Sequence, residues 1–230
     1  MNVLRLFKAK PRIEKELIDR YREISTPNLS DCMERCYGTL GIHVVGDSLK
    51  SLGGKSMVGT AFTVKTRPGD NLVVHKALDL AQPGDILVID ARGQMVNAIL
   101  GELMTLYATH RGIAGIVVDG AIRDSNAISD GKLPVFSKGV SHLGPYKSGP
   151  GEIHGTIQVG GVVINDGDLI VGDHDGIAVV PRDRVNEVIV DAEKIIEKEH
   201  GIRKAIAAGA WDRSWIDPSL QIIEIDDTSK

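Results

Sequence analysis

Residues 84–124 read GDILVIDARGQMVNAILGELMTLYATHRGIAGIVVDGAIRD. Two short apolar runs, 86–89 and 113–118, stand toward the ends of this stretch, and such runs are typical of strands buried on both faces of a parallel sheet. Between them, apolar residues recur at helical spacing, namely Ala98, Leu100, Leu103, Met104, Tyr107 and Ala108. A strand, a helix and a second strand in this order predict a right-handed crossover.

The crossover brings two polar segments to one edge of the sheet, where ligands of open α/β sheets usually bind. The first turn of the helix offers the amides of Leu103 and Met104 to a small anion, and Gly101 lets that anion approach the backbone closely. Arg123 matches a carboxylate, and Asp124 is a hard oxygen ligand for a divalent cation. An adjacent Arg-Asp at a strand end is by itself more often a surface ion pair than a catalytic unit, so the spacing indicates the site without deciding it.

The order of motifs resembles a known family. Gly-Glu-Leu-Met at 101–104 followed by Arg-Asp at 123–124 resembles the class II pyruvate aldolases that cleave 4-hydroxy-4-methyl-2-oxoglutarate and 4-carboxy-4-hydroxy-2-oxoadipate. These enzymes share a fold with the RraA-like proteins, regulators of ribonuclease E activity. The resemblance covers roughly residues 28–182 and includes, in order, Leu29-Ser30-Asp31, Gly59-Thr60-Ala61, Pro68-Gly69-Asp70-Asn71, Pro83-Gly84-Asp85, Val118-Asp119-Gly120, Pro134-Val135-Phe136 and Asp175-Gly176.

The resemblance implies an α/β fold, a single three-layer domain of the swivelling β/β/α (RraA-like) type with N- and C-terminal helical extensions. We place the N-terminal extension at 1–27, the catalytic core at 28–182, and the C-terminal helix and tail at 183–230. A homotrimer or homohexamer with sites between subunits is implied as well. Periodicity by itself supports only a mixed α/β domain. The tail from 211 to 230 departs from the family pattern and receives no role.

The implied activity is cleavage of a 4-hydroxy-2-oxo acid to pyruvate, with decarboxylation of oxaloacetate as a side activity. The resemblance places Mg²⁺ or Mn²⁺ on Asp124. It assigns substrate binding to Gly101, Glu102, Leu103, Met104 and Arg123. It assigns catalytic roles to Arg123, to Glu102, and to Glu199 reaching the site of a neighbouring subunit.

Two positions leave alternatives open within this assignment. The family pattern has an aspartate where this chain has Glu102, so the carboxylate lies one methylene further from the backbone and the substrate can differ. Glu197 competes with Glu199 for the intersubunit role, because the local register of the C-terminal helix is not fixed by the sequence. Proton removal from the substrate hydroxyl is assigned either to a water on the metal or to Glu199.

Two other functions compete with the metal-dependent aldolase. A lysine Schiff base on Lys65, Lys76 or Lys138 would need only a desolvated pocket, and the sequence singles out none of the three. A non-catalytic RraA-like regulator would bind a ribonuclease or another protein. That branch of the family does not keep the metal-ligand aspartate, so Asp124 favours the enzyme.

Composition limits the classes of partner. The 230 residues carry 27 basic and 31 acidic side chains, a net charge of −4, which argues against nucleic acid and anionic membranes as partners. No apolar run approaches the roughly 20 residues that span a bilayer, and the N-terminus turns charged too early for a signal peptide. We therefore expect a cytoplasmic protein that acts on a small oxo acid.

The flanking segments give weaker expectations. Residues 11–24 and a second segment ending near Gly38 have helical patterns. The stretch 141–155 is rich in Gly and Pro and is predicted to be an irregular loop over the site, with His154 as a solvated loop residue. Residues 159–180 show three apolar runs separated by turn signals, which predict hairpins, and Pro181 predicts the start of a long helix.

Overall fold

The computed structural model describes residues 3–225. Residues 1–2 of the predicted N-terminal extension and residues 226–230 of the predicted tail therefore lie outside the described part. The chain divides into two compact units after Ala192, and the domain limits proposed from the sequence remain a prediction.

Four parallel strands form the centre of the main sheet, and they lie side by side in the order of the sequence. These strands are β3 (Met57–Thr66), β4 (Asp85–Ala98), β5 (Gly115–Ile122) and β6 (Val135–Val140). Three helices alternate with them: α3 (Leu72–Leu80), α4 (Glu102–His110) and α5 (Ser125–Asp130). This alternation is the predicted crossover pattern, repeated along the sheet.

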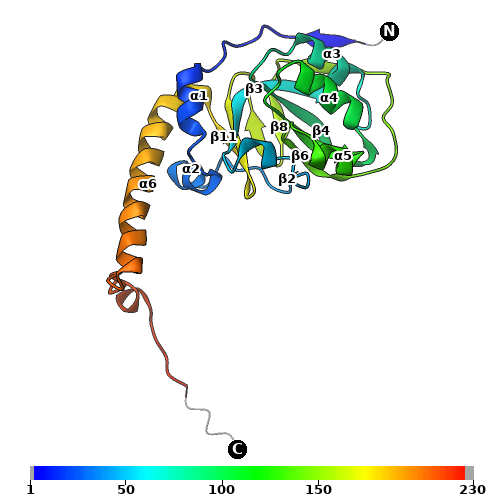
Figure 1. Cartoon of the computed structure of the whole chain (residues 1–230). Coiled ribbons are helices and arrows are strands. Elements are labelled where there is room, and N and C mark those ends of the chain that lie inside the picture. Colours follow the sequence, from blue (N-terminus) through cyan, green and yellow to red (C-terminus); the bar gives the residue numbers. More distant parts are fainter. Residues whose placement is uncertain (1–2, 226–230) are drawn as a thin grey trace, which may run out of the picture. The chain divides into compact units, whose positions relative to one another are not determined.

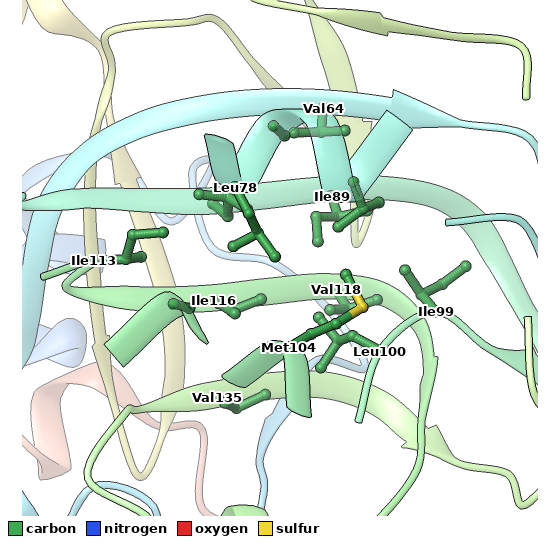
Figure 2. Close-up of a cluster of buried hydrophobic side chains, with 14 of the residues drawn as sticks. Val64, Leu78, Ile89, Ile99, Leu100, Met104, Ile113, Ile116, Val118 and Val135 are labelled. Atoms are coloured by element: carbon green, nitrogen blue, oxygen red, sulfur yellow. The ribbon is translucent and has the colours of Figure 1, made fainter. Parts of the chain in front are cut away.

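The three helices cover one face of the sheet (Figure 1), and their apolar sides enter a buried cluster with every second residue of the strands. Figure 2 shows Leu78 of α3 and Met104 of α4 beside Ile89 and Val118 of the sheet. Because Ile89 and Val118 face the helices, their neighbours Asp90 and Asp119 face the other way.

The opposite face of the sheet is covered by short strands. They are β8 (Ile157–Val159), β9 (Val162–Ile164), β10 (Leu169–Asp173) and β11 (Gly176–Val180). β8 pairs with β9 and β10 pairs with β11, both antiparallel, while β10 also pairs with β3. Their apolar residues form a second buried cluster with the central strands. Strands on one face and helices on the other confirm the predicted α/β fold class.

Peripheral elements complete the main sheet and extend from it. β1 (Leu4–Leu6) pairs in parallel with β7 (Gly151–Ile153), and β2 (His43–Val44) lies antiparallel to β6. α1 (Lys15–Tyr21) and α2 (Thr26–Cys32) are shorter than the predicted helices. The remaining helical segments are η1 (Lys50–Leu52), η2 (Arg182–Arg184), α6 (Val185–Ala207) and η3 (Asp217–Ser219). Within residues 3–225, none of the helices has the length and apolarity needed to cross a membrane.

Three local expectations are wrong. Ala98 and Leu100 were predicted to lie in the helix, but α4 begins only at Glu102. The strand β4 instead continues to Ala98, because Gln94 and Ala98 pair with β5 again after a break in register. The 141–155 stretch contains β7, which pairs with both β1 and β3. His154 is not solvated: its ring packs 4.4 Å from Phe62, and its Nδ1 lies 2.7 Å from a carboxylate oxygen of Asp166.

Candidate active site

Arg123 and Asp124 meet the N-terminus of α4 at the edge predicted from the sequence. The Glu102 amide donates to Asp124 Oδ2 at 3.0 Å, and Arg123 Nε lies 3.6 Å from the same oxygen. The Arg123 amide donates to the Leu100 carbonyl at 2.9 Å, which fixes the end of β5 against the start of the helix. Asp124 therefore caps the N-terminus of α4 from a distant part of the chain. The residue just before a helix usually fills this role.

The backbone at Asp124 has a left-handed conformation, with φ of 57°. Residues other than glycine adopt this conformation rarely, and aspartate is among those that tolerate it. Left-handed residues held by their surroundings cluster at functional sites. Here the conformation turns the chain from β5 into α5 and leaves the carboxylate beside the Glu102 amide.

Gly101 is required by close packing and not by its backbone angles, because its φ is −151°. A Cβ at this position would lie 2.3 Å from Asp124 Oδ2 and 2.8 Å from Arg123 Cγ. Both distances are far shorter than an ordinary van der Waals contact. The two charged side chains consequently lie directly against the backbone of Gly101. The close approach of a bound anion to this glycine stays a prediction.

The two amides predicted to hold a carboxylate have different surroundings. The Met104 amide already donates to the Gly101 carbonyl at 3.2 Å, and the Met104 side chain is buried in the cluster under the helices. The Leu103 side chain is 76 % exposed, and no acceptor for its amide is recorded within residues 3–225. Leu103 is thus the better placed of the two to bind an anion.

The loop after β6 lies beside Arg123. The Leu143 carbonyl accepts from the Ala98 amide at 2.8 Å, and the Gly144 carbonyl accepts from Asn97 Nδ2 at 2.8 Å. A Cβ at Gly144 would lie 3.3 Å from Arg123 Nη1. This part of the predicted loop therefore borders the guanidinium from the side of β4.

Comparison with known proteins decides the family. The family model described as RraA-like, Aldolase/RraA, matches residues 26–179. A protein of Halalkalibacterium halodurans with the name "Putative 4-hydroxy-4-methyl-2-oxoglutarate aldolase" is 39% identical over 195 residues, which cover 84% of this chain and 90% of the relative. The chain belongs to the RraA-like family.

Solved structures agree with this assignment and with the predicted fold. Streptomyces coelicolor RraAS2, described as an unusual member of the RNase ES inhibitor RraA protein family, superposes with a TM-score of 0.76 at 27% identity and covers 84% of this chain and 98% of its own. The RNA-processing inhibitor RraA from Thermus thermophilis has a TM-score of 0.62 at 26% identity, with 69% and 93% covered. The RraA-like fold predicted from the motifs is confirmed.

The half-exposed carboxylate of Asp124 fits a metal ion that keeps much of its water. The side chains of Arg123 and Asp124 are 44% and 42% exposed. Within residues 3–225, no group of three or more His, Cys, Asp and Glu side chains could hold a metal ion. The donor set available to a cation in this RraA-like chain is therefore sparse, and Mg²⁺, which dehydrates reluctantly and uses one or two carboxylates, suits such a set.

The remaining predicted carboxylates, Glu102 and Glu199, belong to different units of the chain. Glu102 is exposed at the first position of α4, one residue from the close contact at Gly101. Glu199 and Glu197 lie on α6 within the second unit, which begins at 193. Glu199 forms an ion pair with Arg203 at 2.8 Å, whereas Glu197 is more exposed.

Proposed function

We propose that this RraA-like protein is a divalent-metal-dependent class II aldolase that cleaves a 4-hydroxy-2-oxo acid, such as 4-hydroxy-4-methyl-2-oxoglutarate, to pyruvate. One observation carries the proposal: Asp124 Oδ2 lies 3.0 Å from the Glu102 amide and 3.6 Å from Arg123 Nε, so a carboxylate, a guanidinium and a helix N-terminus converge. The name of the Halalkalibacterium halodurans relative supports the same substrate class.

The reaction requires stabilisation of negative charge at one oxygen. The C4 hydroxyl of the substrate loses its proton, the C3–C4 bond breaks, and C4 becomes the carbonyl carbon of the second product. The bonding pair remains on C3 as an enolate, whose charge is largest on the C2 oxygen, and protonation of C3 then gives pyruvate. Groups that hold charge at the C2 oxygen lower the barrier most.

Asp124 would hold the metal ion, and water would complete its coordination. When bound there, Mg²⁺ or Mn²⁺ supplies Lewis-acid stabilisation of negative charge. One oxygen of Asp124 is already fixed by the Glu102 amide, so the carboxylate is oriented before any ligand arrives. No hydrogen bond to Oδ1 of Asp124 is recorded within the described residues, which leaves that oxygen available to a cation.

Arg123 and the start of α4 would bind the substrate. The half-exposed guanidinium can donate two parallel hydrogen bonds to the carboxylate and keto oxygens of an oxo acid. The Leu103 amide, at the positive end of the helix, can donate to the same carboxylate. These donors orient the substrate so that the C2 oxygen lies on the side of Asp124.

The proton at the C4 hydroxyl would be taken by Glu199 of a neighbouring subunit, and Glu102 would hold water near the carboxylate of Asp124. An association of subunits in a homotrimer or homohexamer is supported by the outer side of α4, which exposes large apolar side chains. Leu103 is 76 % exposed, Leu106 57 % and Tyr107 41 %. A contiguous apolar surface of this kind is typical of a protein interface.

Release of pyruvate tests the proposed function directly. Oxaloacetate and 4-hydroxy-4-methyl-2-oxoglutarate are each supplied with Mg²⁺, and the assay is repeated with excess chelator. Pyruvate that disappears with chelator is the expected result. Turnover that resists the chelator would instead support a lysine Schiff base, and no turnover of either substrate would contradict the proposed substrate class.

The second candidate is a non-catalytic regulator that binds a ribonuclease. It is favoured by the likeness to RraAS2, an unusual member of the RNase ES inhibitor RraA protein family, and to the RNA-processing inhibitor RraA from Thermus thermophilis. Asp124 separates the candidates, because a regulator that works through protein contacts has no use for a metal ligand. Inhibition of a ribonuclease E by the wild-type chain and equally by Asp124→Asn, without pyruvate release by either, would favour the regulator.

A further inference from the structure

A row of four charged residues crosses the sheet on the face opposite the helices. Lys65 of β3 pairs in register with Asp90 of β4, and Asp90 pairs with Asp119 of β5. Val118 is in register with Ser137 of β6, which brings Lys138 beside Asp119. The four residues lie in four neighbouring parallel strands, and the regular register of β3 with β4 and of β4 with β5 ends at Lys65, Asp90 and Asp119.

The row forms the floor of a cavity of about 650 Å³. The β8–β9 hairpin supplies the other wall through Thr156, Ile157, Gln158 and Val163. A volume of this size is within the range of small-molecule sites in proteins. Sequence reasoning missed the cavity, although it named Lys65 and Lys138 as lysines that a pocket could activate.

An irregularity in β4 brings a further cation to the cavity. The register of β4 with β5 jumps from Asp90 to Gln94, so residues 91–93 leave the ladder. Arg92 within this excursion has a left-handed φ of 56°, which is uncommon for a residue other than glycine. Arg92 and Lys65 line this cavity and also an adjoining one of about 400 Å³.

The two shared cations lack partners of opposite charge. Within residues 3–225, no ion pair is recorded for Lys65 or for Arg92. The carboxylate of Asp90 instead accepts from the Arg92 amide at 2.9 Å. Two unpaired cations at the junction of two cavities provide a binding place for an anionic group.

Asp119 requires a hydrogen-bond donor, whereas the two cations require an anion. The residue is 8 % exposed, and its Oδ1 is buried without a hydrogen-bond partner. Lys138 Nζ lies 3.6 Å from that oxygen, beyond hydrogen-bond range. A buried acceptor without a donor is costly, and a ligand hydroxyl that donates to Asp119 and accepts from Lys138 would satisfy both groups. Lys138 is 41 % exposed in its side chain, so a small movement of the ammonium admits such a hydroxyl.

We infer that this cavity is a second ligand site that binds a small hydroxylated carboxylate. The carboxylate of the ligand lies between Lys65 and Arg92, and one of its hydroxyls lies between Lys138 and Asp119. The site is distinct from the pair Arg123–Asp124, because neither of those residues lines this cavity. A mixed charge lining of three cations and two carboxylates also distinguishes it from a site for a bare metal ion.

Three probes measured by calorimetric titration of the full chain test the inference. D-gluconate carries a carboxylate and a chain of hydroxyls, sorbitol carries hydroxyls alone, and acetate carries the carboxylate alone. We expect saturable binding of D-gluconate, with affinity at least about tenfold above either control, because each control lacks the partner of one of the two sets of groups. Absence of gluconate binding, or equal affinity for all three probes, would overturn the inference.

Two variants locate the binding. Asp119→Asn and Lys138→Met should each weaken gluconate binding by about tenfold, which is typical of losing one hydrogen bond to a charged group. Lys76→Met, which removes the same charge from an exposed position on α3, is the matched control and should bind like the wild type. Lys138→Met is half-exposed and tests the site even if Asp119→Asn fails to fold. Unchanged affinity in Lys138→Met would place the ligand elsewhere.

Discussion

Strand β5 serves two polar regions that differ in almost every physical respect. At its end, Arg123 and Asp124 are 44 % and 42 % exposed in their side chains and lie beside the N-terminus of a helix. Four residues before Arg123, Asp119 is 8 % exposed and lines a cavity between the main sheet and the β8–β9 hairpin. Arg123 and Asp124 follow the end of β5, whereas Asp119 lies within the strand and is in register with Asp90 of β4.

The difference indicates what each region lacks. The exposed pair has fixed donors and a fixed carboxylate but little enclosure, so water is excluded only if another subunit covers it. The cavity is lined by residues of one chain, and the buried Oδ1 of Asp119, which has no hydrogen-bond partner, calls for a ligand that donates to it. We therefore keep the first region as the proposed place of cation binding and of a reaction between subunits, and the second as the proposed place of ligand binding.

The largest expected effect is at Asp124. Asp124→Asn keeps an oxygen that accepts from the Glu102 amide and tolerates the left-handed backbone, so the fold should persist. The loss of the anionic ligand should weaken Mn²⁺ binding by more than about a hundredfold, the upper effect of removing a supporting residue around a metal. Electron paramagnetic resonance of free Mn²⁺ measures this, and unaltered binding would remove Asp124 from the proposed centre.

The next effect distinguishes two glutamates on α6. Glu199→Gln should lower kcat for pyruvate release by at least about a hundredfold, the usual contribution of a general base. Glu197→Gln is the matched control two positions away and should retain activity. Steady-state kinetics of both variants at equal oligomeric state provide the comparison. The reverse order of the two effects would assign the intersubunit role to Glu197.

Gly101→Ala tests the packing of the exposed pair without removing a charge. The added Cβ would lie 2.3 Å from Asp124 Oδ2, so the carboxylate must move by roughly the ångström that can cost about a hundredfold in rate. Gly38→Ala is the control, because its nearest contact would be 4.0 Å away. We expect kcat to fall in the first variant alone, with similar unfolding temperatures. Equal activity in both variants would show that the close contact is unimportant.

The smallest effect concerns pH and the helix layer. Burial lowers the pKa of His75 below its ordinary value of 6.5, and the charge of Lys147 lowers it further. Because the folded state then binds fewer protons than the unfolded state, the free energy of unfolding should decrease as pH falls through 6.5. His75→Gln should show a shallower decrease in urea titrations between neutral and mildly acidic pH. An identical slope would exclude His75 as a cause.

The sequence predicted the Arg123–Asp124 site better than the cavity beside Asp119, for a physical reason. Arg123–Asp124 and 101–104 are joined by one crossover, so local periodicity and the handedness of the connection bring them together. Motifs that resemble the RraA-like family supported the same placement, and the family comparison confirmed that resemblance.

The cavity beside Asp119 depends on the register between four strands, which no local pattern determines. Asp90 and Asp119 each look like an isolated polar residue at the end of an apolar run, and Lys65 and Lys138 look like ordinary surface lysines beside Thr or Ser. A signal was present, since Lys65, Asp90 and Asp119 follow apolar residues that face the helices, but it needs the pairing of the strands to be interpreted. The excursion at Arg92 is equally invisible in the sequence, and it is the reason that Ala98 belongs to β4.

Pyruvate release in Mg²⁺ by two variants measured side by side tests the central claim most directly. The account predicts that Asp124→Asn abolishes chelator-sensitive pyruvate release while Lys138→Met retains the wild-type rate. Loss of activity in Lys138→Met together with normal activity in Asp124→Asn would contradict it. That result would place the chemistry in the cavity beside Asp119 and would leave Asp124 as a structural cap of α4.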